Sequence, residues 1–194
     1  MTRSIGLVAA VLVFAGCGSG KEGASPATSP RPTATVTTSD CTSPADAATS
    51  PRLSPALQNR ETVYLTDVNA YTRRCLDRVT FTLRKGTHGP GYEVSYQPAE
   101  SAKIEDGSGK HLEIAGSAFL VVRLSPAATA ELKGDQLEFT YTGPRRLRPE
   151  GFNHVLEIVK TGDFESVVTW VIGLDEKRPF TATASETNLV IQIS

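Results

Sequence analysis

The sequence predicts an all-β fold, an antiparallel β-sandwich with one short helix, preceded by a disordered tether. Apolar side chains recur at every second residue in many short segments after Thr62, which is the period of strands with one buried face. Clusters of Gly, Pro, Asp and Ser separate these segments at the spacing of an antiparallel sandwich or barrel. The preceding stretch is rich in Ser, Thr, Pro and Ala and shows no such alternation.

The most apolar pair of predicted strands lies within residues 154–175. Strands are predicted over Val155–Lys160 and Glu165–Leu174, with a tight turn at Thr161–Asp163. Because side chains alternate across a strand, Trp170 and its even-numbered neighbours face one side, and Val171 and its odd-numbered neighbours face the other. Both sets are largely apolar. We therefore expect the second strand to be a central strand between two packed layers.

The remaining strands are predicted from shorter alternating runs. Their apolar positions are Val63/Leu65, Val79/Phe81/Leu83, Tyr92/Val94/Tyr96, Leu120/Val122/Leu124, Leu137/Phe139/Tyr141 and Leu189/Ile191/Ile193. Turns are predicted at Lys85–Gly91, Asp106–Gly109 and Thr142–Pro144. The segment Ser125–Gly134 predicts the short helix, because Ser is a good N-cap, Pro suits the first helical position and Gly suits the end.

Size and charge limit the classes of function. The 194 residues carry a formal net charge of -1, and the part after the tether has the size of one domain. The chain lacks the basic field that nucleic-acid-binding proteins present to phosphates. We therefore expect no nucleic-acid partner.

The N-terminus predicts export and lipid anchoring. Met1–Ser4 carries one positive charge, and the apolar run Ile5–Ala15 is too short to span a bilayer but fits a signal peptide. Ala15-Gly16-Cys17 resembles a bacterial lipobox, which implies a signal peptide over residues 1–16 and a lipidated Cys17. The alternative is a secretory signal with an incidental cysteine. Two acyl chains hold a protein on a membrane stably, so Cys17→Ser is expected to release this protein from the membrane fraction. Unchanged partitioning would contradict the anchor.

Residues 17–58 are predicted to form a disordered tether. They contain few large apolar side chains, so they cannot bury enough surface to offset the entropy lost on ordering. Fully extended, such a segment would reach on the order of 100 Å from the membrane.

The other two cysteines predict a disulfide bond between Cys41 and Cys75. Outside the cytoplasm paired cysteines are usually oxidised, and closing a loop of this length contributes about 3–4 kcal/mol in the chain-entropy model. The alternative is a free or intermolecularly bonded Cys41. Two reactive thiols in the purified mature protein without reductant would exclude the bridge.

The order of elements resembles the AMIN-like domain of actinobacterial envelope lipoproteins. The resemblance covers roughly residues 62–194, and the predicted domain extends over residues 60–194. The segments that carry it are Cys75–Phe81, Gly89–Tyr96, Asp106–Gly109, Leu124–Ala127, Gly162–Asp175, Pro179–Phe180 and Leu189–Ile193. It implies a sandwich related to the AMIN domain, which in other proteins accompanies cell-wall amidases and pilus secretins and is associated with targeting to peptidoglycan. The resemblance implies no catalytic residues.

The sequence predicts no enzyme, no metal site and no cofactor. His88, His111 and His154 lie far apart and belong to no metal-ligand motif, so we interpret them as surface histidines. There is no Gly-x-Ser-x-Gly motif and no phosphate-binding glycine loop before a helix. Asp175 and Glu176 are interpreted as the charged end of a hairpin. A hydrolase would require distant residues to converge.

A ligand site is predicted at Arg145, Arg146 and Arg148, which lie between two prolines and follow Tyr141. Guanidinium groups match carboxylates and phosphates, and a tyrosine ring can stack on a sugar. The alternative is a solvated loop. Tyr92 and Tyr96 form a second candidate surface, with core packing as the alternative.

Together these features predict a lipoprotein on the extracytoplasmic face of the membrane. Its sandwich would be a non-catalytic module that binds peptidoglycan or an associated wall polymer. The alternative is an assembly factor that binds another envelope protein.

Overall fold

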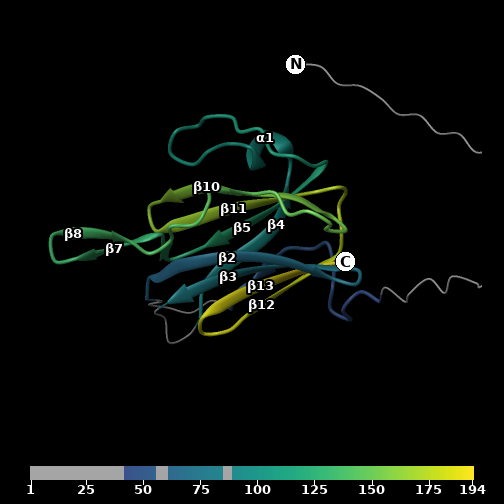
Figure 1. The fold of residues 1–194 in the computed structure, drawn as a ribbon, viewed down its shortest axis with the longest axis horizontal. Coiled ribbons are helices and arrows are strands. Elements are labelled where there is room, and N and C mark those ends of the chain that lie inside the picture. The colour runs from purple at the N-terminus through teal and green to yellow at the C-terminus, as the bar shows by residue number, and fades with distance from the viewer. Residues whose placement is uncertain (1–41, 56–60, 85–88) are drawn as a thin grey trace, which may run out of the picture. The chain divides into compact units, whose positions relative to one another are not determined.

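Two β-sheets pack face to face, and a small hairpin projects from one end of the pair (Figure 1). The computed structural model describes residues 42–55, 61–84 and 89–194, all within one unit of residues 38–194. The predicted all-β sandwich is confirmed. The predicted signal peptide, Cys17, Cys41 and most of the predicted tether lie outside the described residues.

The first sheet has six strands. Their order is β1 (Arg52–Leu53), β4 (Tyr92–Gln97), β5 (Ala118–Leu124), β11 (Val167–Leu174), β10 (Val155–Phe164) and β9 (Arg146–Leu147). All neighbours in it are antiparallel.

The second sheet has five strands. Their order is β12 (Phe180–Ala184), β13 (Asn188–Ile193), β3 (Leu76–Arg84), β2 (Val63–Arg73) and β6 (Ala127–Ala128). The contact of β2 with β6 is parallel and the others are antiparallel. The projecting hairpin consists of β7 (Ala130–Lys133) and β8 (Gln136–Phe139).

Strand β11 is the central strand that the sequence predicted, because both of its faces are buried. Trp170 is fully buried between the sheets, where the rings of Phe81 and Tyr141 contact it edge-on at centroid distances of 6.0 and 5.6 Å. On the opposite face Val171 belongs to a second apolar cluster, which includes Ala102 of helix α1 (Ala99–Ala102). Figure 1 shows α1 and its flanking loops above β10 and β11.

The predicted hairpin of residues 154–175 exists, but its turn lies later than expected. The turn residues are Glu165 and Ser166, both with positive φ, and Gly162 lies inside β10 next to a register irregularity. A side chain at position 162 would collide with Asp106. Gly162 therefore provides space for a neighbouring segment, and its presence misplaced the predicted turn.

The helix predicted at Ser125–Gly134 is wrong. Ala127 is fully buried beside β2, and its N–H donates to the carbonyl oxygen of Ser166 at 2.8 Å. Pairing with these neighbours outweighs the helix signals, which are weak for a short segment. The helix lies instead after Pro98.

The predicted tether extends too far. Residues 42–55 belong to the domain, since Arg52 and Leu53 pair with β4. Ala48 and Phe180 exchange backbone hydrogen bonds of 3.1 and 3.0 Å. These are backbone contacts, which the apolar content of a segment does not reveal.

The run Leu137/Phe139/Tyr141 does not form a half-buried strand. Leu137 and Phe139 of β8 are solvent-exposed, whereas Tyr141 lies beyond the strand and is buried.

Candidate functional site

Two adjoining cavities lie at the end of the sandwich where the β2–β3 turn and the C-terminus meet. One has a volume of about 590 Å³ and the other about 580 Å³. Thr42, Cys75 and Leu76 line both cavities, so the two share a wall. These volumes are in the range of small-ligand sites.

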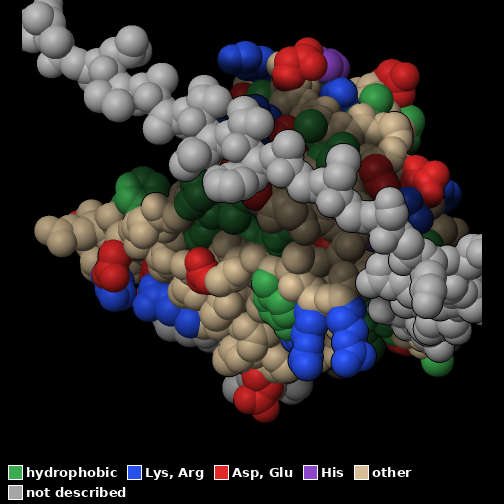
Figure 2. Space-filling model, turned by 45° about the vertical axis from the view of Figure 1, so that its right-hand side comes forward, with side chains coloured by type: hydrophobic (Ala, Val, Ile, Leu, Met, Phe, Trp, Pro, Cys, Tyr) green, Lys and Arg blue, Asp and Glu red, His purple; other side chains and the backbone are tan. Residues whose placement is uncertain are grey.

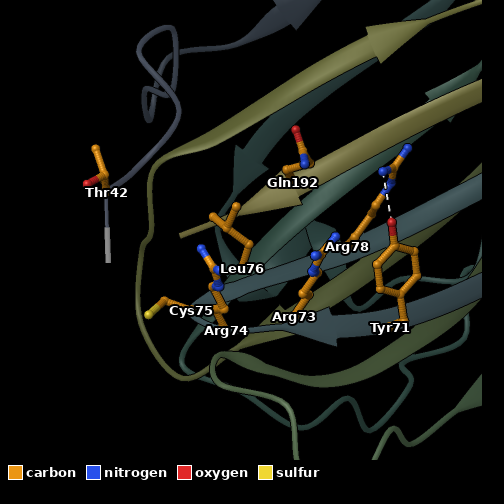
Figure 3. Close-up of a pocket in the computed structure, with 8 residues that line it drawn as sticks. All are labelled: Thr42, Tyr71, Arg73, Arg74, Cys75, Leu76, Arg78 and Gln192. Carbon is orange, nitrogen blue, oxygen red and sulfur yellow. Dashed lines mark hydrogen bonds between the residues drawn. The ribbon is translucent and has the colours of Figure 1, made fainter. Parts of the chain in front are cut away.

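The first cavity lies against the outer face of the five-stranded sheet. Tyr71 of β2 and Gln192 of β13 are both direct neighbours of Arg78 on β3, and Arg73 is paired with Leu76. Since paired residues share a face of the sheet, these side chains form one surface. We call this surface the arginine platform; with the turn residue Arg74 it comprises Tyr71, Arg73, Arg74, Leu76, Arg78 and Gln192 (Figure 3).

Arg78 is held by an aromatic neighbour. Its Nη1 donates a hydrogen bond of 2.8 Å to the hydroxyl oxygen of Tyr71, and its guanidinium carbon lies 5.5 Å from the centre of that ring (Figure 3). This contact orients the guanidinium group without neutralising its charge.

Among the described residues, the three guanidinium groups of the platform have no carboxylate partner. In the described part of the chain, no ion pair involves Arg73, Arg74 or Arg78. Three like charges therefore face one cavity. A carboxylate or phosphate is the group that such forked donors bind best.

Hydrogen bonds from the Asn153 side chain hold the turn that carries Arg74 in place. The side-chain amide nitrogen of Asn153 lies 2.7 Å from Thr72 Oγ1, 3.1 Å from the carbonyl oxygen of Arg74 and 3.0 Å from Asp77 Oδ1. Arg74 itself has a φ of 56°, in the left-handed region that non-glycine residues rarely adopt. The surrounding contacts hold this residue in a strained conformation at the rim of the cavity.

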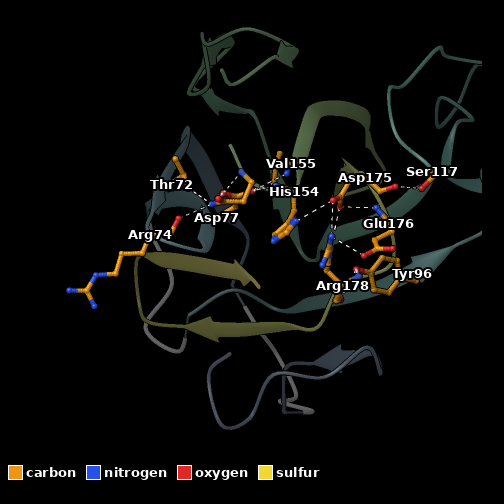
Figure 4. A network of polar contacts seen from close by, with 11 residues as sticks. Thr72, Arg74, Asp77, Tyr96, Ser117, His154, Val155, Asp175, Glu176 and Arg178 are labelled. Carbon is orange, nitrogen blue, oxygen red and sulfur yellow. Dashed lines mark hydrogen bonds and ion pairs between the residues drawn. The ribbon is translucent and has the colours of Figure 1, made fainter. Parts of the chain in front are cut away.

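Asp77 connects the β2–β3 turn to the loop before β10. Its carboxylate is fully buried and accepts backbone N–H groups of Asn153, His154 and Val155 at 3.1, 2.7 and 2.9 Å (Figure 4). Burial raises the pKa of Asp77, but the hydrogen bonds outweigh it, so the net pKa is below the usual value of 3.8. An ionised Asp77 thus fixes one wall shared by the two cavities.

A polar network borders the second cavity. His154 Nδ1 lies 3.2 Å from Asp175 Oδ2, and Arg178 Nη2 lies 2.9 Å from the same oxygen and 2.8 Å from Glu176 Oε1 (Figure 4). Burial raises the pKa of Asp175, but bonds from Arg178, His154 and the Glu176 N–H lower it to about 2. Asp175 and Glu176 therefore both hold the guanidinium group of Arg178 in place.

The histidine predictions have mixed outcomes. The interpretation of His154 as a surface histidine is wrong, since its side chain is only 16% exposed. His111 is at the surface, as expected, with 55% of its side chain exposed. His88 lies outside the described residues.

The three arginines chosen from the sequence lie elsewhere and are paired with carboxylates. Arg146 and Arg148 both bind Oε1 of Glu157, whose side chain is 1% exposed, and Arg145 binds Glu105 at 2.6 Å. Burial raises the pKa of Glu157, but hydrogen bonds from the Ala115 N–H and the two arginines lower it by more. The net pKa is therefore below the usual value of 4.5. This cluster neutralises a buried charge, a role that neither the ligand-site interpretation nor the solvated-loop alternative included.

The predicted role of Tyr141 in stacking on a sugar is wrong. Its ring is buried against Trp170, and its hydroxyl donates to the carbonyl oxygen of Pro144 at 2.7 Å. Burial raises its pKa to about 12. Tyr92 and Tyr96 pack against the core, as the alternative interpretation held, and Tyr96 bonds to the backbone of Arg178.

Sequence reasoning missed the arginine platform although a signal was present. Residues 73–78 contain three arginines, the same number as the more compact segment 145–148, and Tyr71 precedes them at strand spacing. The number of arginines does not distinguish the two clusters. The difference lies in the acidic residues that the fold brings to one and not to the other.

Charges of both signs are interspersed over the face shown in Figure 2, where adjacent basic side chains project from the lower edge. In the described ranges, no group of three or more His, Cys, Asp or Glu side chains could hold a metal ion. Among the same residues, no helix combines the length and apolarity that a membrane span requires.

Comparison with known proteins identifies the family. The model of the AMIN-like domain matches residues 63–194, from the start of β2 to the last residue. The chain therefore belongs to the AMIN-like domain family, as the sequence resemblance implied. No curated protein and no solved structure matches the chain.

Proposed function

We propose that this protein is a non-catalytic envelope module that binds peptidoglycan or an associated anionic wall polymer through the arginine platform. The observation that carries the proposal is the set of three guanidinium groups, without carboxylate partners in the described residues, around one cavity. Membership of the AMIN-like family supports a role in the envelope.

The chemistry of the platform suits a repeating anionic polymer. Guanidinium forks bind carboxylates and phosphates in two-point contacts, and the half-exposed ring of Tyr71 offers a face to a sugar or an aliphatic group. A single shallow site of this kind binds weakly, but a polymer presents many equivalent groups.

The proposal includes anchoring at the extracytoplasmic face of the membrane. Residues 1–16 would be removed as a signal peptide, and lipidated Cys17 would hold the module through the following tether. A disulfide between Cys41 and Cys75 would attach the tether at the site, because Thr42, the next residue, lines both cavities together with Cys75.

Co-sedimentation with purified cell walls tests the proposed function. Residues 18–194, which lack the predicted signal peptide and anchor, should pellet with walls at low salt and less at high salt. The variant Arg73→Ala/Arg74→Ala/Arg78→Ala should lose at least tenfold in affinity. The matched control Lys110→Ala/Arg123→Ala/Lys133→Ala removes the same charge outside the platform and should pellet nearly as wild type.

Two results would contradict the proposal in different ways. Pelleting that the platform variant retains would move the site elsewhere. Failure of the wild type to pellet at low salt would exclude wall binding.

The projecting hairpin favours a second candidate function, the binding of another envelope protein. Leu132 is paired with Leu137 and Ala130 with Phe139, so one face of the hairpin is apolar. Leu132, Leu137 and Phe139 are 68%, 61% and 65% exposed. A contiguous exposed apolar face marks interaction surfaces. Crosslinking in cells should then capture a defined partner, and Leu132→Ser/Phe139→Ser should lose it while wall pelleting is unchanged.

A further inference from the structure

Strand β2 leaves most of one edge without a neighbouring strand. Along one edge it pairs with β3 from Tyr64 to Arg73, but along the other it pairs with β6 only at Val63 and Tyr64. Beyond these two residues, no strand among the described residues borders that edge of β2. An unpaired edge of this length is a template for a further strand.

The backbone groups of Val68, Ala70 and Thr72 point out from this edge. The N–H of Leu83 donates to the carbonyl oxygen of Thr187 at 2.7 Å, so the odd-numbered residues of β3 face β13 and its even-numbered residues face β2. Those even-numbered residues pair with the odd-numbered residues of β2. The even-numbered residues of β2 therefore turn their N–H and C=O groups outward, where they have no backbone partner among the described residues.

The other outer strands are short or covered. Strands β1, β6 and β9 have two residues each, and Phe180 of β12 exchanges backbone hydrogen bonds with Ala48. The segment Asp67–Arg73 of β2, by contrast, contains no proline, no lysine and no register irregularity, which are features that prevent edge strands from pairing. This edge is therefore suited to pairing with another strand.

The exposed face of the same segment carries opposite charges at its two ends. Asp67, Asn69, Tyr71 and Arg73 are all exposed and lie on the outer face of the sheet. Neither Asp67 nor Arg73 forms an ion pair with a described residue. If two copies of the segment pair antiparallel with Ala70 at the centre, Asp67 of each copy lies opposite Arg73 of the partner subunit.

The same register also gives the most backbone hydrogen bonds. It places Val68 opposite Thr72 of the partner subunit and Ala70 opposite its own counterpart, so the outward-facing residues exchange about six backbone hydrogen bonds. Moving the centre by one residue in either direction leaves about four bonds and separates the two charged residues. Hydrogen bonding and charge therefore favour one register.

We propose that two copies of this chain associate through their β2 edges, antiparallel and centred on Ala70, so that their five-stranded sheets form one continuous sheet. Reciprocal ion pairs between Asp67 and Arg73 of the partner subunit fix the register. The partner is a second copy because the segment complements its own charge pattern under a two-fold axis, as the interface of a symmetric dimer must.

This pairing has a consequence for the arginine platform. Since the two outer faces become one, the two platforms lie on the same face of the continuous sheet, and the interface does not use Arg74 or Arg78. If the proposed function holds, one polymer can contact both platforms, which increases the affinity without any new contact. The dimer itself does not depend on the proposed function.

Analytical ultracentrifugation of residues 18–194 over a concentration series, without wall material, tests the inference. The wild type should show a reversible equilibrium between monomer and dimer. Asp67→Arg and Arg73→Asp each place like charges opposite one another, so each should weaken association at least tenfold. The matched control Glu113→Arg makes the same change of charge at a side chain that is 94% exposed, and it should dimerise as the wild type does.

Mixing the two single variants distinguishes this interface from any other. One variant has arginine at both positions 67 and 73, and the other has aspartate at both. In a mixed dimer each arginine therefore faces an aspartate. An equimolar mixture should form heterodimers with about the wild-type affinity although neither variant dimerises alone, and this recovery also shows that both variants fold.

Several outcomes would overturn the inference. They are a wild type that stays monomeric at about 1 mM, single variants that both still dimerise, and a mixture that stays monomeric. A dimer that non-reducing electrophoresis shows to be disulfide-linked would count against it as well. Because none of these measurements uses wall material, co-sedimentation with walls remains an independent test of the proposed function.

Discussion

The molecule contains two arginine clusters that look alike in sequence and differ in three dimensions. Arg145, Arg146 and Arg148 all contact carboxylates, and two of them share the buried Glu157. The arginine platform faces a cavity and has no carboxylate partner in the described ranges. The first cluster neutralises a charge that the fold has buried, and the second keeps its charge available to a ligand.

The difference teaches that the number of arginines in a segment does not identify a binding site. Burying a carboxylate costs free energy unless counter-charges and hydrogen bonds stabilise it. It therefore forms ion pairs with the cations that the fold places beside it. The outer face of β2, β3 and β13 presents Tyr71, Arg78 and Gln192 in one row, with no acidic side chain in that row.

The largest expected effect concerns stability. Arg146→Ala/Arg148→Ala leaves Glu157 buried without either guanidinium group, and we expect the free energy of unfolding to fall by about 3 kcal/mol. The matched pair Arg73→Ala/Arg78→Ala should change it by only about 1 kcal/mol, because Arg73 is exposed and the partly buried Arg78 loses only its contact with Tyr71. Urea denaturation measures both. Equal losses would show that the platform is structural.

The second largest expected effect is a difference between the two clusters in how the free energy of unfolding depends on acid pH. The pKa of Glu157 is lowered in the folded protein, so its ionised form stabilises the fold above the usual value of 4.5. That contribution is lost as the pH falls from 4.5 through the lower folded pKa. Glu157→Gln should therefore flatten the decline of stability below pH 4.5.

The Arg73→Ala/Arg78→Ala protein is the control for this measurement and should keep the wild-type decline. Chemical unfolding at several pH values from 6 down to 3 provides the comparison. An unchanged slope in Glu157→Gln would mean that Glu157 does not contribute to acid sensitivity.

The smallest expected effect tests whether strain is stored at the platform. Arg74 has a positive φ, and asparagine tolerates this conformation better, so Arg74→Asn should raise the free energy of unfolding by up to about 1 kcal/mol. The same variant should bind cell walls less tightly, because one cation is lost. Arg73→Asn, within strand β2, should lose affinity without any gain in stability.

Most of the sandwich could be predicted from the sequence because strand alternation is a local property. The apolar positions of β2, β3, β4, β5, β11 and β13 were predicted and are buried or packed against the core. Turn and helix signals were less dependable. Gly162 indicated a turn but makes room for Asp106, and Ser125–Gly134 indicated a helix but pairs with β2 and forms a hairpin.

The sequence by itself determined the all-β class, the central position of β11 and the family to which the chain belongs. Only the tertiary structure decided which arginines face a cavity and which neutralise Glu157. It also decided that His154 is held by Asp175 and that Asp77 is buried under three backbone N–H groups. The physical reason is that strand alternation depends on neighbours along the chain, whereas the ion pairs and hydrogen bonds of Glu157, His154 and Asp77 depend on partners 9 to 78 residues away.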